Sequence, residues 1–189
     1  VFFGEEAFLD NVEISAAEFY DRMAAAKTLP RTSQPSVELF QDAYRSLAGD
    51  GVAIVSIHVS SRLSGTLNAA SIAREVVKHD VHVDLIDSYN VSLGLGLIVL
   101  EAARAAQAGA SLSEVVATPR RAMDRVSVHV AVDTLEYLQK GGRIGRARSL
   151  LGSVLSIKPI VCVDDGEVAP FERVRTRAKA IERMFQLAS

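Results

Sequence analysis

A short apolar run, followed by a hydroxyl-rich turn and an amphipathic helix, constrains the fold of this chain more than any other segment. Val52–Val59 is rich in β-branched residues, which is typical of a strand covered on both faces. The turn Ser60–Thr66 that follows carries three serines and a threonine around one glycine. A helix with one apolar face is predicted next, and that face consists of Leu67, Ala70, Ala73 and Val77. This order indicates a strand–turn–helix unit of an open α/β sheet.

The turn between this strand and this helix is predicted to bind a small negative group. Open α/β sheets bind ligands at the carboxyl ends of their strands, where a helix N-terminus favours an anion. One of Ser60, Ser61 and Ser64 is expected to cap the helix. A cap requires one hydroxyl and the turn has four, so the others remain available as donors. The alternative is that the serines form only a turn and its cap.

The rest of the chain predicts two kinds of sheet. Residues 81–88 resemble a second strand and precede a very apolar helix near residues 93–107, an order that implies a parallel sheet with right-handed crossovers. Further on, apolar and polar residues alternate strictly over 126–132, and Asp165-Gly166 is a hairpin signal. Both features are typical of antiparallel strands.

We therefore predict an α/β protein with two domains. A Rossmann-like parallel-sheet domain is expected over residues 1–122, and a second, smaller α/β domain with antiparallel strands over residues 123–189. The chain opens without a methionine and ends within a helical pattern. It is therefore expected to be a fragment, truncated at both ends.

Local signals predict where several helices begin. The N-caps are expected at Ser15, Ser36, Ser111 or Ser113, Asp133 and Thr176. Asp133 is expected to form a capping box with Glu136, and a further helix is expected near residues 146–155.

Composition excludes several classes of function. The net charge of −2 gives no general attraction to nucleic acid, and the absence of Trp argues against base stacking. The longest apolar stretch, Val91–Ala103, is too short to span a bilayer, so no stable membrane insertion is expected. With no resemblance to a signal peptide at the N-terminus, a cytoplasmic protein is expected. The single cysteine, Cys162, lies in an apolar run and is expected to be a core residue.

Known catalytic patterns are missing from the sequence. There is no phosphate-binding loop of the G-x-x-x-x-G-K-[ST] type and no metal-ligand spacing among the histidines. His58 is expected to be a hydrogen-bonded core residue. If the sheet is doubly wound, Thr32–Gln34 and Asp87–Asn90 are expected to converge with Ser60–Thr66. The basic glycine-rich loop Lys140–Arg146 either approaches the ligand with its glycines and cations or is a solvated loop after a helix that the glycines end. A binding protein with no metal or cofactor explains these features better than an enzyme does.

Five short motifs follow one another along nearly the whole chain: Thr32–Pro35, Ile57–Thr66, Val132–Leu138, Gly141–Gly145 and Ile157–Ile160. Each motif is weak alone, but five in the right order are specific. Together they resemble the DegV family of bacterial fatty-acid-binding proteins.

The resemblance implies a fold and a role. It implies two α/β domains that enclose the acyl chain in a tunnel, with a long-chain fatty acid as ligand. Thr32 and Ser64 would hydrogen-bond the carboxylate, and Arg143 would help to neutralise it. The supporting turn would consist of Ser60, Ser61, Gly65 and Thr66.

The resemblance also implies a partner. A separate fatty acid kinase catalytic subunit would phosphorylate the bound carboxylate, giving an acyl phosphate for phospholipid synthesis, and the binding protein would need no cofactor. The sequence departs from the family pattern at both ends. The usual first strand is missing before residue 1, and the usual C-terminal part, which carries a histidine near the carboxylate, is missing after residue 189.

Two alternatives remain open at this point. The first is a small-molecule kinase or phosphatase that uses the Ser60–Thr66 turn to bind phosphate, with Asp87 as the best candidate for a metal ligand. The second is a regulatory interaction module whose basic loop Lys140–Arg148 docks an acidic partner.

Overall fold

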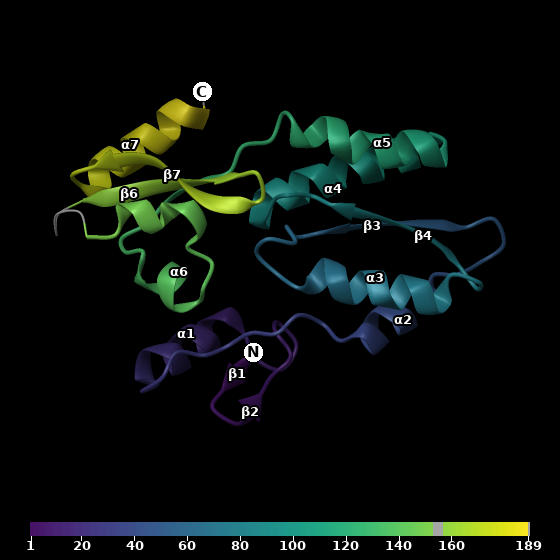
Figure 1. Ribbon diagram of the computed structural model, residues 1–189, viewed down its shortest axis with the longest axis horizontal. Coiled ribbons are helices and arrows are strands. Elements are labelled where there is room, and N and C mark those ends of the chain that lie inside the picture. The colour runs from purple at the N-terminus through teal and green to yellow at the C-terminus, as the bar shows by residue number, and fades with distance from the viewer. Residues whose placement is uncertain (153–156, 189) are drawn as a thin grey trace. The chain divides into compact units, whose positions relative to one another are not determined.

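The computed structural model describes residues 1–152 and 157–188. Backbone contacts group the chain into two compact units, residues 1–34 and 35–189. The first unit holds a small antiparallel pair, β1 (Phe2–Phe3) and β2 (Glu6–Ala7), followed by helix α1 (Ala16–Ala25) (Figure 1). The predicted division of the chain at residue 122 remains a prediction.

A parallel pair of strands forms the centre of the first half of the larger unit. Strand β3 (Ala53–His58) pairs in parallel with β4 (His82–Asp87). Helices α2 (Val37–Ser46) and α3 (Thr66–Val77) lie on one face of this pair. The other face is covered by α4 (Ser92–Gln107) and α5 (Leu112–Met123), so the strands lie between two helical layers (Figure 1). The predicted parallel sheet with crossover helices is confirmed.

Apolar side chains from α2, α3 and the two strands form the core beneath this sheet. Val77 is completely buried and packs with its neighbours because the apolar face of α3 turns toward the strands. On the opposite face, α4 buries Ile98 completely. The buried members of the first cluster are Tyr44, Ala73, Val77, Val81 and Val83.

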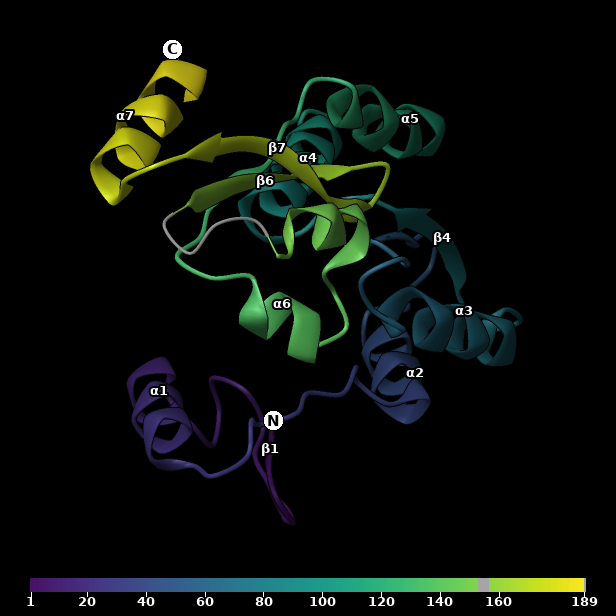
Figure 2. The same cartoon turned by 60° about the vertical axis from the view of Figure 1, so that its left-hand side comes forward.

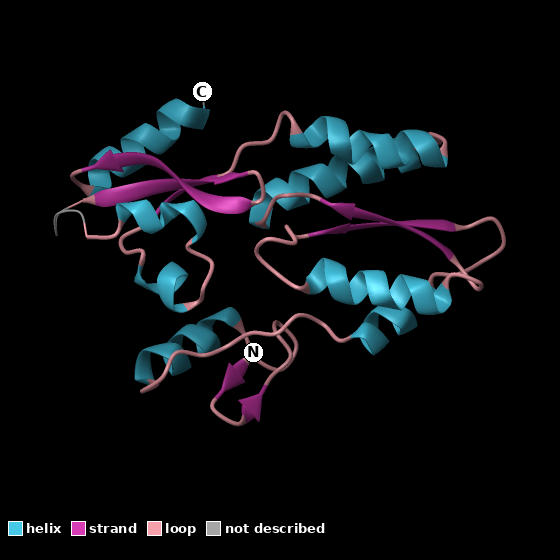
Figure 3. Ribbon diagram, in the orientation of Figure 1, coloured by secondary structure: helices cyan, strands magenta, loops and turns pink. Residues whose placement is uncertain are grey.

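The second half of the larger unit is built on an antiparallel sheet. Its strands lie in the order β5 (His129–Ala131), β6 (Lys158–Asp164) and β7 (Glu167–Val174). Figure 3 shows the long β6–β7 hairpin that dominates this sheet. The two residues at its tip have positive φ, 49° at Asp165 and 77° at Gly166, as a two-residue hairpin turn requires. The predicted antiparallel strands and hairpin are confirmed.

Two α-helices and one 3₁₀ helix accompany this sheet in the described part of the chain. They are α6 (Glu136–Lys140), the 3₁₀ helix η1 (Gly145–Leu150) and the C-terminal α7 (Arg177–Ala188). One core cluster joins η1 and the segment before α6 to the inner face of the hairpin, and its buried members are Leu135, Ile144, Ala147, Leu150, Val161 and Val168. The chain is therefore an α/β protein with a parallel sheet and separate antiparallel strands, as predicted.

Two predictions of helices in the second half of the larger unit differ from the structure. Asp133 does not cap α6, whose N-cap is Leu135 with no side-chain bond. The Asp133 carboxylate instead pairs with Lys158 at 3.0 Å and with Arg177, because these cations from distant segments neutralise its charge. The helix expected over residues 146–155 is a 3₁₀ helix that ends at Leu150, and residues 153–156 lie outside the described part of the chain.

Candidate functional site

The hydroxyl-rich turn Ser60–Thr66 connects the carboxyl end of β3 to the start of α3. Ser60 is completely buried, and its backbone N–H donates to the carbonyl oxygen of Asn90 at 2.9 Å. The carbonyl oxygen of Ser60 accepts hydrogen bonds from the N–H groups of Leu63 (3.0 Å) and Ser64 (3.1 Å). The first residue of the turn therefore organises the peptide groups that follow it.

A carboxylate from the end of β4 holds the turn from the other side. Both oxygens of Asp87 accept the N–H of Ser61, at 3.2 and 3.3 Å, and Oδ1 also accepts the N–H of Tyr89 at 2.9 Å. The prediction that Asp87–Asn90 and Ser60–Thr66 converge at one edge of the sheet is confirmed. The contacts of Asp87 with backbone N–H groups give it a structural role in the turn.

Ser64 lies two residues before α3 and is linked to Thr66, the first residue of that helix. Its Oγ lies 2.8 Å from Thr66 Oγ1 and accepts the N–H of Thr66 at 3.3 Å. The N-cap residue is Gly65, and no side chain caps the helix, so the expectation of a serine N-cap is wrong. The Ser60 hydroxyl donates to the carbonyl oxygen of Gly166 at 2.6 Å and accepts the N–H of Arg62 at 3.2 Å, so both of its partners lie outside the first turn of α3.

The uncapped start of α3 contrasts with other helices of the chain. Side chains of Ser15, Ser36 and Ser111 cap α1, α2 and α5, as predicted. The N-terminus of α4 also has no side-chain cap and lies at the same edge of the sheet as that of α3, since both helices follow a parallel strand. Two positive helix ends thus lie at the carboxyl edge of β3 and β4, and at α3 the Ser64 hydroxyl accepts only the N–H of Thr66. This arrangement can bind an anion.

Arg143 brings a positive charge to the turn. Its Nε donates to the carbonyl oxygen of Leu63 at 3.1 Å, and one terminal nitrogen donates to the carbonyl oxygen of Gly141 at 2.5 Å. The guanidinium is therefore anchored next to the residue that precedes Ser64, although 80 residues separate Arg143 from Leu63. Thr32 belongs to the unit of residues 1–34, where it is exposed.

A cavity of about 260 Å³ lies in the second half of the larger unit. It is smaller than the roughly 300–1,000 Å³ typical of small-molecule sites. The predicted carboxylate ligands do not line it. Sequence reasoning missed this cavity, although two of the five motifs, Val132–Leu138 and Ile157–Ile160, contribute residues to it. Its lining residues are Asp133, Thr134, Leu135, Glu136, Gln139, Leu150, Leu151, Gly152, Ile157, Pro159 and Arg173.

His58 ends strand β3 within a chain of buried hydrogen bonds. Its Nε2 lies 2.7 Å from Ser56 Oγ, which in turn lies 2.9 Å from the hydroxyl of Tyr44. The imidazole also packs edge-on against Phe40, with the ring centroids 5.4 Å apart. Burial lowers the pKa of His58 below its usual value of 6.5, and the nearby charge of Asp87 opposes this shift. The prediction of a hydrogen-bonded core histidine is confirmed.

The lowered pKa of His58 predicts a pH-dependent stability. As the pH falls below 6.5, the unfolded chain binds the proton before the folded protein does, so the stability contributed by neutral His58 is lost. The wild-type protein is therefore expected to lose more unfolding free energy between about pH 7.5 and about pH 5 than His58→Gln does. Urea unfolding at each pH measures this difference, and the exposed His79→Gln is the matched control. Equal pH dependence in the wild type and His58→Gln would contradict the prediction.

Residues 1–152 and 157–188 contain no cluster of three or more His, Cys, Asp or Glu side chains that could hold a metal ion. None of the helices in these ranges has the length and apolar character needed to cross a bilayer.

Comparison with known proteins places the whole chain in one family. The profile described as "Uncharacterised protein, DegV family" matches residues 1–189. A DegV domain-containing protein of Clostridium perfringens is 39% identical over 179 residues, covering 93% of this chain and 63% of the relative. Protein DegV of Bacillus subtilis is 36% identical, covering 99% of this chain and 66% of the relative. The chain thus spans slightly less than two thirds of the length of these relatives.

Solved structures agree with this assignment. DegV of Bacillus subtilis, described as a fatty acid binding protein, superposes with a TM-score of 0.88 at 34% identity, covering 99% of this chain and 66% of that one. A DegV family protein from Thermus thermophilus, reported for its fatty acid binding, superposes with a TM-score of 0.84 at 34% identity, covering 93% and 62%. A stearic acid-binding protein from Eubacterium ventriosum gives 0.85 at 29% identity, covering 98% and 64%. Because the family profile matches residues 1–189 and the relatives are up to 39% identical, the chain belongs to the DegV family.

Proposed function

We propose that this protein binds a long-chain fatty acid whose carboxylate lies at the Ser60–Thr66 turn. The observation that carries this proposal is the uncapped N-terminus of α3, which follows a turn rich in hydroxyl groups and held from three sides. Free N–H groups and hydroxyl donors at a positive helix end match the needs of a carboxylate. The fatty acids bound by the relatives from Bacillus subtilis and Thermus thermophilus supply a ligand with this chemistry.

The proposed residue roles are those that the DegV resemblance implies. Ser64 and Thr32 donate hydrogen bonds to the carboxylate, and Arg143 supplies a compensating positive charge beside Leu63. Ser60, Ser61, Gly65 and Thr66 shape the turn: Ser60 and Thr66 bond within it, and the N–H of Ser61 donates to Asp87.

The energetics favour such a ligand. Burial of about fourteen methylenes contributes on the order of 10 kcal/mol before the costs of ordering. Desolvation of the carboxylate opposes binding by several kcal/mol when the charge is unpaired. Two hydroxyl donors at roughly 1.5–3 kcal/mol each offset much of that cost, with the helix N-terminus adding to them.

The proposed role extends to a partner enzyme. The protein would hold the acyl chain while the catalytic subunit of a fatty acid kinase transfers a phosphoryl group to the carboxylate, giving an acyl phosphate for phospholipid synthesis in the bacterial cytoplasm. The acyl chain would run between an N-terminal domain of residues 1–122 and a second domain that begins at residue 123. The DegV resemblance supports this role, and the exposed side chains of Ser61 and Arg62 at the turn are consistent with access by a partner.

Lipid extraction tests the proposed function directly. The purified 189-residue protein is denatured and extracted with organic solvent, and the released lipids are identified by mass spectrometry. We expect stoichiometric fatty acid, because apolar burial of the acyl chain gives slow release during purification. The control is the same extraction after delipidation and incubation with palmitate. Protein that is folded, carries no lipid and takes up no palmitate would contradict the proposal.

A further inference from the structure

The tip of the β6–β7 hairpin contacts the Ser60–Thr66 turn, although the two segments lie 106 residues apart in the sequence. Figures 1 and 2 both show the tip reaching the carboxyl ends of β3 and β4. The Ser60 hydroxyl donates a 2.6 Å hydrogen bond to the carbonyl oxygen of Gly166, and the Ser60 side chain is completely buried. A buried carbonyl that lost this donor would carry an unmet desolvation cost. The two groups therefore form a specific contact, which we call the Ser60–Gly166 clasp.

The residue at position 166 must be glycine for this contact to form. Its φ of 77° lies in the left-handed region. A Cβ there would lie 2.5 Å from Ser60 Oγ and 2.7 Å from Tyr89 Cδ1. The hairpin backbone thus approaches the turn more closely than any side chain at this position would allow.

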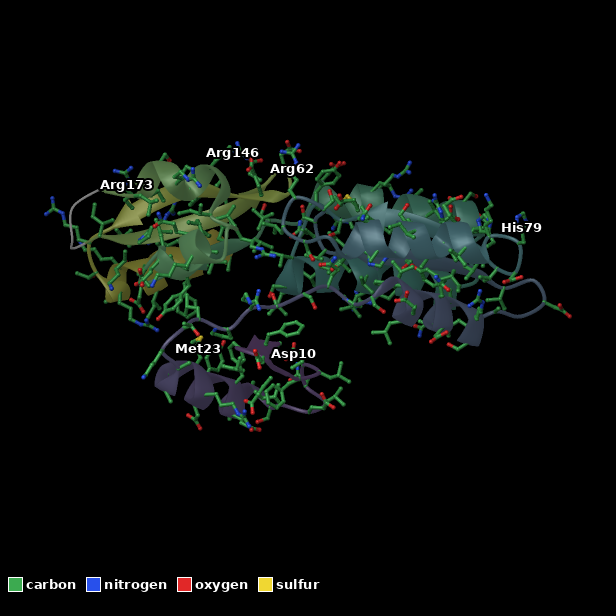
Figure 4. All side chains as sticks on the ribbon, turned by 60° about the horizontal axis from the view of Figure 1, so that its bottom comes forward. Asp10, Met23, Arg62, His79, Arg146 and Arg173 are labelled. Carbon is green, nitrogen blue, oxygen red and sulfur yellow. The ribbon has the colours of Figure 1, made fainter. Side chains whose placement is uncertain are left out.

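Ion pairs surround the clasp on the exposed side. Arg62 pairs with Asp165 at 2.8 Å and approaches Glu167 at 3.8 Å. Arg146 pairs with Glu167 at 3.0 Å and with Asp164 at 2.6 Å, and Figure 4 shows the side chains of Arg62 and Arg146 on the same edge of the molecule. Exposed pairs of this kind contribute little individually. The buried hydrogen bond is therefore the main specific contact between hairpin and turn.

Ser60 transmits this contact to Ser64. Its Oγ also accepts the N–H of Arg62 at 3.2 Å, and its carbonyl oxygen accepts the N–H groups of Leu63 and Ser64. A shift of Ser60 would therefore displace the N–H groups of Arg62, Leu63 and Ser64. Ser64 is the residue whose hydroxyl is proposed to bind the ligand. No part of this chain of contacts requires Ser60 or Gly166 to touch the ligand.

We propose that Ser60 and Gly166 are positioning residues: the carbonyl of the hairpin tip fixes Ser60, and Ser60 fixes the backbone that presents Ser64 to the ligand carboxylate. This inference rests on the proposed function for the identity of the ligand. The Ser60–Gly166 clasp itself is a contact within the protein and does not depend on the ligand. The hairpin thereby couples the second half of the larger unit to the binding turn in the first half.

Ser60→Ala tests the clasp, with Ser56→Ala as the matched control. Ser56 lies within β3 and Ser60 lies two residues after its end. Both hydroxyls make two hydrogen bonds, but only those of Ser60 fix the turn. After delipidation, Ser60→Ala is expected to bind radiolabelled palmitate about tenfold more weakly than wild type, while Ser56→Ala stays within about twofold. Both variants are expected to unfold at a lower temperature than wild type. If Ser60 had only a structural role, the two variants would therefore have similar palmitate affinities.

Hydrogen exchange of the ligand-free protein provides a readout that needs no ligand. The amides of Arg62, Leu63 and Ser64 are expected to exchange about tenfold faster in Ser60→Ala than in wild type, with β4 unchanged. If Ser60→Ala does not fold, Gly166→Ala tests the same contact from the hairpin side.

If both single variants fold, a double-mutant cycle for palmitate affinity tests whether they act on one contact. The affinity losses of Ser60→Ala and Gly166→Ala are expected to be less than additive, because both substitutions break the same hydrogen bond.

The outcomes separate this inference from the proposed function. Wild-type affinity in Ser60→Ala, or weaker binding without faster exchange of the turn amides, would overturn the positioning role while leaving the ligand assignment intact. If the wild-type protein binds no palmitate, the proposed function fails. In that case, faster amide exchange in Ser60→Ala would still support the conclusion that the hairpin tip fixes the turn backbone. Unchanged exchange would overturn that conclusion.

Discussion

Simultaneous replacement of Ser64 and Thr32 by alanine is expected to abolish fatty acid retention while leaving the protein folded. Each hydroxyl that donates to a carboxylate contributes roughly 1.5–3 kcal/mol, so loss of both lowers the affinity by about 10²- to 10⁴-fold. The Ser64 hydroxyl makes only local bonds to Thr66, and Thr32 is exposed, so neither change removes core packing. The measurement is the lipid content of the purified variant, together with palmitate binding after delipidation.

A matched double variant controls for the removal of two hydroxyls. Ser46→Ala combined with Thr118→Ala removes one serine and one threonine hydroxyl from helix surfaces, where each donates to a carbonyl of its own helix. This control is expected to retain fatty acid at the wild-type level. Unchanged lipid content in the Ser64→Ala, Thr32→Ala variant would rule out these residues as the carboxylate ligands.

Gly145→Ala is expected to give the largest loss of stability among single-methyl additions to the glycine-rich loop. Gly145 has a φ of 50°, and a Cβ there would lie 2.5 Å from the carbonyl oxygen of Val168. The neighbouring atom is backbone of β7 and cannot rotate away, so the sheet or the 3₁₀ helix must shift. Left-handed strain and overpacking together are expected to cost about 3 kcal/mol.

Gly142→Ala separates the two causes of this cost. Gly142 lies in the same loop with a φ of 74°, and no atom lies within 4 Å of the position of its Cβ. Only the conformational strain applies there, so a loss of about 1 kcal/mol is expected. Urea unfolding of both variants measures the difference. Equal losses at the two positions would show that Val168 accommodates the methyl group.

Much of the architecture could be predicted from local signals. The caps at Ser36 and Thr176 and the hairpin turn at Asp165-Gly166 form as expected, since each depends on side chains within a few residues. The parallel and antiparallel sheets follow from hydrophobic periodicity, because a buried strand and a one-sided strand differ in their patterns. The family could be identified from the order of its motifs.

Long-range contacts account for the predictions that were wrong. Asp133 has the sequence context of an N-cap, but Lys158 and Arg177 neutralise it from segments that the local pattern does not include. Ser60 has the chemistry of a cap, but its hydroxyl donates to the distant carbonyl oxygen of Gly166 and accepts the N–H of Arg62, so it bonds no N–H group of α3. A polar side chain takes the partner that tertiary structure brings to it, and a local window does not contain that partner.

The amino-acid sequence alone therefore determined most of the secondary structure, the fold class and the family, and it indicated the hydroxyl-rich turn as the candidate site. Only the tertiary structure decided which groups hold that turn: Asp87 at the end of β4, Gly166 at the hairpin tip and Arg143 beside Leu63. The physical reason is that helix, strand and cap preferences arise from neighbouring residues. The geometry of an anion site instead depends on hydrogen bonds between segments that meet only after the chain has folded.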